Sequence, residues 1–151
     1  MDRILEDNSG SIVNYSESDV DLLARLMRAE ALGEGELGML MVGNVVVNRV
    51  ISTCLTFKPY DTVYKVIYQN PGGFSGVNSA LFNAPATANE KMLARLCLNG
   101  HTFYPATNAL WFYAPKSGES CLALWYNQRN AGRFKNHCFY KPDPGTCPML
   151  Y

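Results

Sequence analysis

Hydrophobic residues recur at helical spacing in the segment that ends near residue 32. Leu23, Leu26 and Met27 occupy positions i, i+3 and i+4, and Glu30 occupies position i+7 of the same pattern. The spacing predicts an amphipathic helix whose apolar face carries one acidic residue. A carboxylate at this place needs a reason, because an unpaired charge in an apolar setting destabilises the folded chain.

The flanking residues predict where this first helix begins and ends. Ser16 and Ser18 are the candidate N-caps, since a serine oxygen can accept hydrogen bonds from the first free backbone N–H groups. Gly33 is expected to end the helix in the left-handed conformation.

A second helix is predicted over residues 37–50. The valine run 45–47 alone is typical of a strand, but the whole apolar segment is too long for one. Gly43 would let this helix pack closely on a neighbour. Asn44 and Asn48 are one turn apart, so we expect them to line a polar edge.

The middle of the chain alternates short helices with an irregular loop. Asp61 is the expected N-cap of a helix over 62–68, and the stretch 69–76, rich in Gly and Pro, is predicted to be a substrate-facing loop. The segment 87–90 has the spacing of a capping box and opens a third long helix, which Gly100 ends.

After residue 100 the pattern changes to short aromatic-rich segments. Residues 109–114, 122–126 and 137–140 predict a small antiparallel sheet. The expected fold is therefore mainly α, of the α+β kind, with a helical core and a small sheet near the C-terminus. Residues 1–15 are polar and aperiodic and are expected to form a flexible arm, so that 16–151 are a single domain.

Composition excludes several classes of partner. Thirteen basic and thirteen acidic residues cancel, so no global field recruits nucleic acid or an anionic membrane. No apolar run approaches the ~20 residues that span a bilayer, and membrane insertion is not expected. The N-terminus has no apolar signal core, so we expect synthesis in the cytosol.

The cysteines leave their redox state open. Cys97 lies on an apolar helical face and is expected to be a small core residue. Cys121, Cys138 and Cys147 cluster near the C-terminus, but their spacings match no zinc motif, and we expect neither a metal nor another cofactor. Free thiols are the default for these residues and for Cys54, and disulfides in an oxidising layer are the alternative.

Glu30 is the leading candidate for chemistry. Burial disfavours the charged form of a carboxyl, so we expect a raised pKa for Glu30, and a carboxyl that keeps its proton is what a general acid requires. The alternative is an ordinary ion pair with Arg49 or Arg95.

The supply of other carboxylates favours a mechanism that needs only one. Asp61 and Glu90 are expected to cap helices, which leaves few partners for a two-carboxylate glycosidase. In the lytic transglycosylase reaction a single Glu protonates the glycosidic oxygen and then accepts the proton of the sugar's own 6-hydroxyl, which attacks C1.

A Cys/His hydrolase is the rival chemistry. Cys54 or Cys121 would have to meet His101 or His137 within hydrogen-bond reach. His137 and its neighbour in the sequence, a cysteine, cannot form the dyad, because adjacent residues of a strand point to opposite faces.

The aromatic residues of the predicted sheet allow two interpretations. Alternation should place Trp111 and Tyr113 on one face and Phe112 on the other. These rings can simply pack in the core, or one face can form the stacking wall of a glycan cleft. Phe74 and Ser75 are expected to face a substrate from the glycine-rich loop.

Several ordered motifs resemble those of the SleB/CwlJ cell-wall hydrolases, the spore cortex-lytic enzymes. Residues 23–50 are similar to the pattern LARxxxAEAxGE…G…VxxVVxNRV, and residues 66–75 to VxYQxxxFS. Trp111-Phe112-Tyr113 and the ending 121–140 continue the resemblance, which is strongest to the short CwlJ type.

This resemblance implies a lysozyme-like catalytic domain that cleaves spore-cortex peptidoglycan during germination. Glu30 matches the family's catalytic acid, and Glu34 its second glutamate. The residues expected to contact substrate are Glu34, Asn48, Gln69, Phe74, Ser75, Trp111, Tyr113 and Tyr140. The resemblance also implies manufacture in the mother cell and deposition at the boundary of spore coat and cortex, with coat proteins as possible partners. A glycan-binding or coat-assembly module without turnover is the non-enzymatic alternative, and a Cys-dependent amidase or peptidase the enzymatic one.

Overall fold

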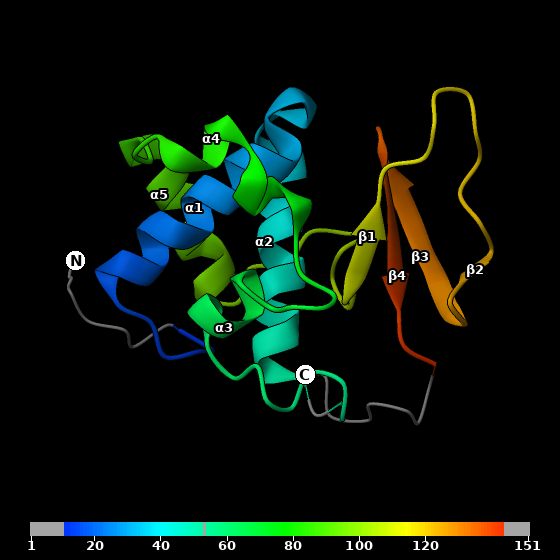
Figure 1. Ribbon diagram of the computed structural model, residues 1–151, viewed down its shortest axis with the longest axis horizontal. Helices are drawn as coiled ribbons and strands as arrows, with labels where there is room; N and C mark the ends of the chain where they lie inside the picture. The colour runs from blue at the N-terminus through cyan, green and yellow to red at the C-terminus, as the bar shows by residue number, and fades with distance from the viewer. Residues whose placement is uncertain (1–10, 53, 144–151) are drawn as a thin grey trace.

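The computed structural model describes residues 11–52 and 54–143. It places a helical layer beside a four-stranded antiparallel sheet (Figure 1). The helices are α1 (Glu17–Ala31), α2 (Gly35–Ile51), α3 (Val63–Ile67), α4 (Ala80–Asn83) and α5 (Ala88–Leu98), with 3₁₀ turns at Leu32–Glu34 and Ser75–Asn78. The strands are β1 (Trp111–Tyr113), β2 (Leu124–Trp125), β3 (Gln128–Phe134) and β4 (His137–Lys141), in the order β1-β4-β3-β2. The predicted mainly helical architecture is confirmed.

Both ends of α1 lie where they were predicted, but the conformation expected of Gly33 was wrong. Ser16 caps the helix in a reciprocal capping box with Asp19. Gly33 does not adopt the left-handed conformation. The chain instead makes a 3₁₀ turn after Ala31, and Gly35, with φ 80°, is the left-handed residue from which α2 starts.

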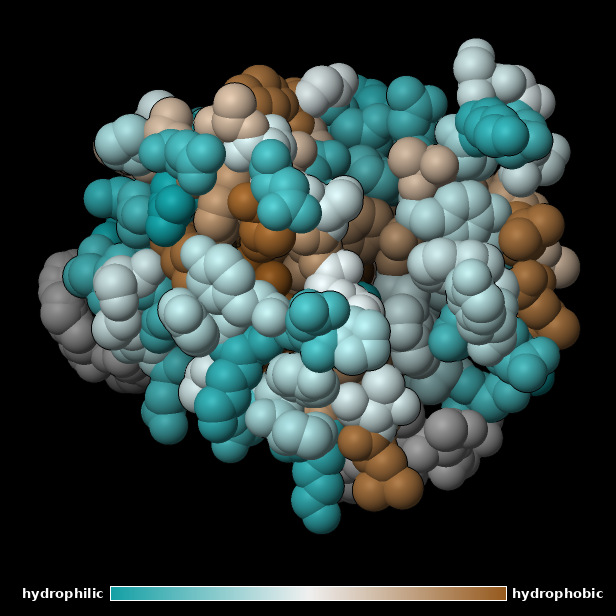
Figure 2. All heavy atoms as spheres, in the orientation of Figure 1, coloured by the Kyte–Doolittle hydropathy of each residue, from teal (hydrophilic) through white to brown (hydrophobic). Residues whose placement is uncertain are grey.

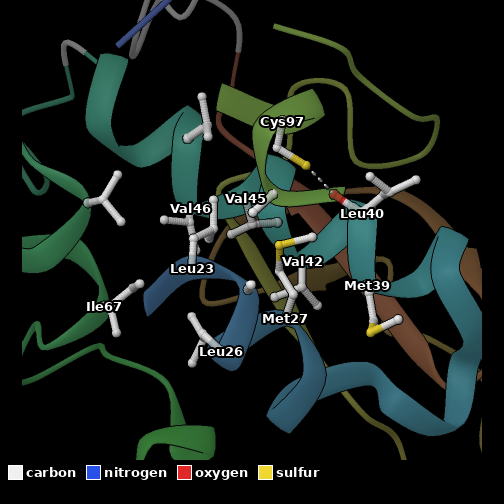
Figure 3. Packing of buried hydrophobic residues seen from close by; sticks show 14 of the residues in the cluster. Leu23, Leu26, Met27, Met39, Leu40, Val42, Val45, Val46, Ile67 and Cys97 are labelled. Carbon is white, nitrogen blue, oxygen red and sulfur yellow. Dashed lines mark hydrogen bonds between the residues drawn. The ribbon is translucent and has the colours of Figure 1, made fainter. Parts of the chain in front are cut away.

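The core lies where α1, α2 and α5 meet (Figure 3). Gly43 permits this approach, as predicted: a Cβ added there would lie 2.6 Å from Cys97 Sγ and 3.1 Å from Met27 Sδ. Cys97 is a core residue, also as predicted. Its Sγ donates to the carbonyl of Leu40 at 3.3 Å, and burial raises the pKa of its thiol to about 12.

Asn44 and Asn48 line one polar edge of α2, as predicted, and this edge is buried. Both are buried in the face of α2 that meets the connection between α5 and β1. Asn44 donates to the carbonyl of His101 and accepts from the N–H of Phe103, while the amide nitrogen of Asn48 donates to three carbonyls within 106–109. These bonds satisfy buried backbone groups that have no helix or sheet partner.

All three expected strands are confirmed, β1 and β2 in shortened form and β4 one residue longer, and one strand was missed. The polar run that forms β3 has only a weak alternation and is bulged between Asn130 and Gly132. At this end of the sheet Leu122 and Leu124 are exposed, and apolar atoms gather at the β2 edge of the face seen in Figure 2.

The default of free thiols is wrong for three cysteines. Cys121 and Cys138 form a disulfide, with their Cα atoms 5.7 Å apart, because the loop before β2 returns alongside β4. Cys54 is disulfide-bonded as well. The oxidised alternative therefore holds for these residues. Cys147 lies outside the described residues.

Two local expectations also change. The cap of α3 is Thr62, whose Oγ1 accepts from the N–H of Lys65, and Asp61 instead forms an exposed ion pair with the same lysine. Of the expected arm, residues 11–15 are not loose: the N–H of Ile12 donates to Leu98 and a buried valine follows it. Residues 1–10 and 144–151 lie outside the described part. No described helix has the length and apolar character needed to span a bilayer.

Candidate active site

A cleft of about 510 Å³ opens where the end of α1 faces the sheet. Its wall combines residues from the helical layer, the glycine-rich loop and all four strands. They are Glu30, Arg49, 72–75, 111–114, Trp125, Tyr126, Gln128 and His137. The volume is in the usual range for small-molecule and oligosaccharide-sized sites.

Glu30 lies in the last turn of α1, half-buried in this wall. Burial raises the pKa of its carboxyl, against the opposing effects of the Gly76 N–H and of charge on His137. The alternative of an ion pair fails in the described structure, where neither Arg49 nor Arg95 forms a salt bridge with it. The arrangement favours the protonated form of this carboxyl relative to a carboxyl in water.

Gly76 fixes the orientation of the Glu30 carboxyl. Its backbone N–H donates to Oε2 of Glu30 at 2.5 Å, and a Cβ added at Gly76 would lie 2.5 Å from the same oxygen. The 3₁₀ turn Ser75–Asn78 therefore lies closer to the Glu30 carboxyl than it could if residue 76 carried a Cβ atom. The second oxygen, Oε1, has no hydrogen-bond partner among the described residues and is left for a ligand.

Glu34 lies behind the cleft wall instead of in it. Its Oε1 is 2.8 Å from Nδ1 of His137, its Oε2 accepts from the N–H of Asn136 at 3.0 Å, and its carbonyl accepts from Nζ of Lys135. Both Glu34 and His137 are buried, at 7% and 6% exposure. Glu34, which the sequence predicts to contact substrate, does not line the cleft: it binds the β3–β4 turn to the junction of α1 and α2.

Arg49 brings a buried positive charge to the wall. Its Nε donates to Leu110, and its Nη1 donates to Gly72 and to Oε1 of Gln69. The ring centroid of Phe74 lies 4.7 Å from its guanidinium carbon. Burial lowers the pKa of Arg49 to about 10, and none of the acidic side chains in the described structure pairs with it.

Four of the predicted contact residues line the cleft, namely Phe74, Ser75, Trp111 and Tyr113. As expected, Phe112 is on the opposite face of β1 from its neighbours: it packs on Phe139, whereas Tyr113 stacks on Tyr140.

Three other predicted contacts are not available to a ligand in the cleft. Asn48 is committed to backbone carbonyls, and Gln69 is buried and accepts from Arg49. Tyr140 is fully buried behind Tyr113, where its hydroxyl donates to a backbone carbonyl at 2.6 Å. These residues support the wall from behind.

Gln128 was not anticipated. Its Oε1 is the one buried side-chain nitrogen or oxygen without a hydrogen-bond partner in the described parts of the chain, and the residue lines the cleft. An unpaired buried acceptor is unfavourable until a ligand donates to it. Such a site suits a sugar hydroxyl or an acetamido N–H. Gln128 belongs to the polar strand β3 that hydrophobic alternation failed to reveal.

The rival Cys/His chemistry finds no nucleophile among the cysteines that the structure describes. Cys54, Cys121 and Cys138 are in disulfides, and the thiol of Cys97 is buried in the helical core. No group of His, Cys, Asp and Glu in residues 11–52 and 54–143 is arranged to hold a metal ion.

Known proteins resemble this chain over most of its length. Two proteins named cell wall hydrolase CwlJ, from Oceanobacillus iheyensis and Bacillus subtilis, are 47% and 45% identical over 141 residues, which cover 93% of this chain and 99% and 97% of theirs. A spore cortex-lytic enzyme of Bacillus cereus is 30% identical over 115 residues, 75% of this chain and 42% of that protein.

The fold is shared with a solved structure. The catalytic domain of the Bacillus cereus SleB protein superimposes with a TM-score of 0.66 at 25% identity, covering 89% of this chain and 98% of that one. A family model described as Cell Wall Hydrolase matches residues 33–140. The chain therefore belongs to the cell wall hydrolase family.

Proposed function

We propose that the protein cleaves the glycan strands of spore-cortex peptidoglycan, with Glu30 as the general acid. The observation that carries this proposal is a half-buried carboxyl with a raised pKa in the wall of a cleft. The name of the Bacillus cereus relative, spore cortex-lytic enzyme, supports the cortex as substrate. Such a protein would act at the boundary of coat and cortex, where coat proteins would be its neighbours.

A lytic transglycosylase mechanism is the finer part of the proposal. Among the described residues Glu30 is the only carboxylate in the cleft wall, whereas a two-carboxylate glycosidase needs a second one on the other side of the bond. The Glu30 carboxyl would donate its proton to the glycosidic oxygen as the bond to C1 breaks. The sugar's own 6-hydroxyl would then bond to C1 and pass its proton to a base in the cleft wall, which leaves a 1,6-anhydro end.

The rest of the wall suits a polar polymer with acidic groups. Rings such as Trp111 and Trp125 can stack on sugar faces. Gln128 offers an unused acceptor to a hydroxyl or acetamido group. The charge of Arg49 suits the carboxylates that muramic acid and its peptides carry.

The experiment is the release of soluble fragments from isolated cortex by Glu30→Gln, which keeps the shape of the side chain and removes the acid. A loss of about 10²–10⁴-fold is expected. Glu36→Gln is the matched control, because Glu36 is exposed and bonds only to Asn89. Near-wild-type release by Glu30→Gln would reject the assignment.

Mass spectrometry of the fragments tests the mechanism separately. Anhydro ends would support the transglycosylase reaction, and reducing ends would show that water is the nucleophile instead. Binding to cortex without any release would favour the non-catalytic alternative.

A further inference from the structure

The dyad formed by Glu34 and His137 has no role in the reaction as described so far. Its hydrogen bond joins Oε1 of Glu34 to Nδ1 of His137 at 2.8 Å, across 103 residues of sequence. A carboxylate bound in this way requires an N–H on Nδ1, so the proton of the neutral ring is on that nitrogen. The other nitrogen, Nε2, then carries the lone pair.

The lone pair of Nε2 faces the cleft. His137 lines the cleft together with Glu30, and its Nε2 has no hydrogen-bond partner within 11–52 and 54–143. Nε2 is also accessible to solvent. Among the described residues the only buried side-chain nitrogen or oxygen without a hydrogen-bond partner is Oε1 of Gln128, so the unpartnered Nε2 is not buried. The edge of the ring is fixed by Phe112, whose ring meets it at 90° with centroids 5.1 Å apart.

Glu34 is held as firmly as the ring it orients. Its second carboxylate oxygen accepts from the N–H of Asn136, and its backbone carbonyl accepts from Lys135. Gly38 lies so close that a Cβ there would be 2.4 Å from Cβ of Glu34. A carboxylate fixed by a backbone N–H and by one imidazole nitrogen is the arrangement that orients a histidine base in hydrolases.

We propose that His137, oriented by Glu34, is the base that takes the proton from the attacking hydroxyl while Glu30 gives its proton to the leaving oxygen. The proposal rests on the function proposed above and divides its proton transfers between two residues. Nε2 of His137 would gain the proton as the hydroxyl oxygen bonds to C1, and the C1–O bond to the leaving sugar would break as Glu30 protonates that oxygen. His137 then carries a positive charge beside the Glu30 carboxylate. One proton passed from the imidazolium to that carboxylate, directly or through water, restores the starting state.

The dyad also gives the second glutamate of the sequence motif a physical task. Glu34 is a positioning residue, because it reaches the cleft only through His137. Of the charged groups, Glu34 bonds to the ring and Glu30 interacts with it electrostatically. Arg49 and the phenols of Tyr113 and Tyr126 share the cleft wall with it, and Lys135 donates to the backbone carbonyl of Glu34.

The first test is cortex-fragment release by His137→Asn, in which the amide can still donate toward Glu34 but no basic nitrogen remains. A loss of about 10²–10⁴-fold is expected. His101→Asn is the matched control, because His101 is the only other histidine of the sequence and is exposed. If His137→Asn works at the wild-type rate while Glu30→Gln is inactive, the role of His137 is refuted and the proposed function stands.

The second test separates a positioning role for Glu34 from a structural one. In Glu34→Gln the ring loses the carboxylate that fixes its Nδ1 proton, so kcat should fall with KM little changed, and nitrogen NMR should no longer show the proton on Nδ1 alone. A lower rate with the proton still held on Nδ1 would contradict the proposal.

A third measurement needs no variant. Nitrogen NMR of the folded wild-type protein at the pH of maximal activity should show Nδ1 protonated and Nε2 bare. An imidazolium at that pH would overturn the assignment.

Discussion

Gly76→Ala should inactivate the protein without unfolding it. The added Cβ would lie 2.5 Å from Oε2 of Glu30 and 3.1 Å from its Cδ, whereas ordinary contacts begin at 3.4 Å. The carboxyl must therefore move by about 0.9 Å, the difference between the first and last of these distances, or the 3₁₀ turn must move instead. Either shift lengthens or breaks the hydrogen bond from the Gly76 N–H.

The size of the effect follows from that displacement. A misplacement of about 1 Å in a reacting group can reduce a rate by about 10²-fold, so a loss of this order is expected in cortex-fragment release. The fold should persist, because the carboxyl borders an open cleft and can be pushed into it. Thermal unfolding followed by circular dichroism would check this.

Gly33→Ala is the control, because Gly33 belongs to the same sequence motif as Glu30. A Cβ at Gly33 would meet nothing within 4 Å, and its backbone is not left-handed. This variant should keep its activity although it lies closer to Glu30 in the sequence than Gly76 does. Comparable rates for Gly76→Ala and the wild type would show that the close approach of the turn does not set the position of the acid.

Three further predictions concern stability. The folded-state pKa of Glu30 is raised above its ordinary value of 4.5. The protonated carboxyl therefore contributes its full stability to the folded state below pH 4.5, and this contribution is lost as the pH rises through the folded-state pKa. Glu30→Gln should therefore unfold at a higher temperature than the wild type at neutral pH, and the advantage should shrink below pH 4.5; an advantage that does not depend on pH would contradict the linkage. Gly43→Ala should cost about 1–3 kcal/mol by overpacking against Cys97, and Cys97→Ala in the same chain should recover part of that loss in urea titrations. Alanine at both Cys121 and Cys138 removes a disulfide that joins residues 17 positions apart, and should lower the free energy of unfolding by about 3 kcal/mol. The expected fall in Tm by calorimetry is about 6–12 °C. An unchanged Tm would show that the stability of the sheet does not depend on the disulfide.

Local signals predicted the helices well because their determinants lie within a few residues. Ser16 with Asp19, and Thr87 with Glu90, form the capping boxes that their spacing indicates. The strand β3 was missed because its run is mostly polar, and its pairing with β4 is what makes it a strand. Glu30 could be singled out as the candidate acid from the sequence, since a carboxyl on an apolar stripe is a local feature.

The rest of the site depends on contacts between distant parts of the chain. Gly76 is 46 residues from Glu30, and the ring that Glu34 binds is 103 residues away. Periodicity carries no information on such pairs. Asn48 was assigned to substrate because it shares a motif with Glu30, yet its amide is used up by backbone carbonyls.

The two asparagines of α2 have a consequence for how the chain tolerates changes in length. Asn44 and Asn48 stand one helical turn apart, about 6 Å along the axis, and each holds a different point of the connection before β1. The spacing of the two asparagines therefore fixes the length of the connection between its two anchored points. An insertion within 101–109 would shift β1 and the aromatic wall of the cleft. The exposed segment 115–120 has no such anchor on α2, and we expect that insertions are accommodated there instead.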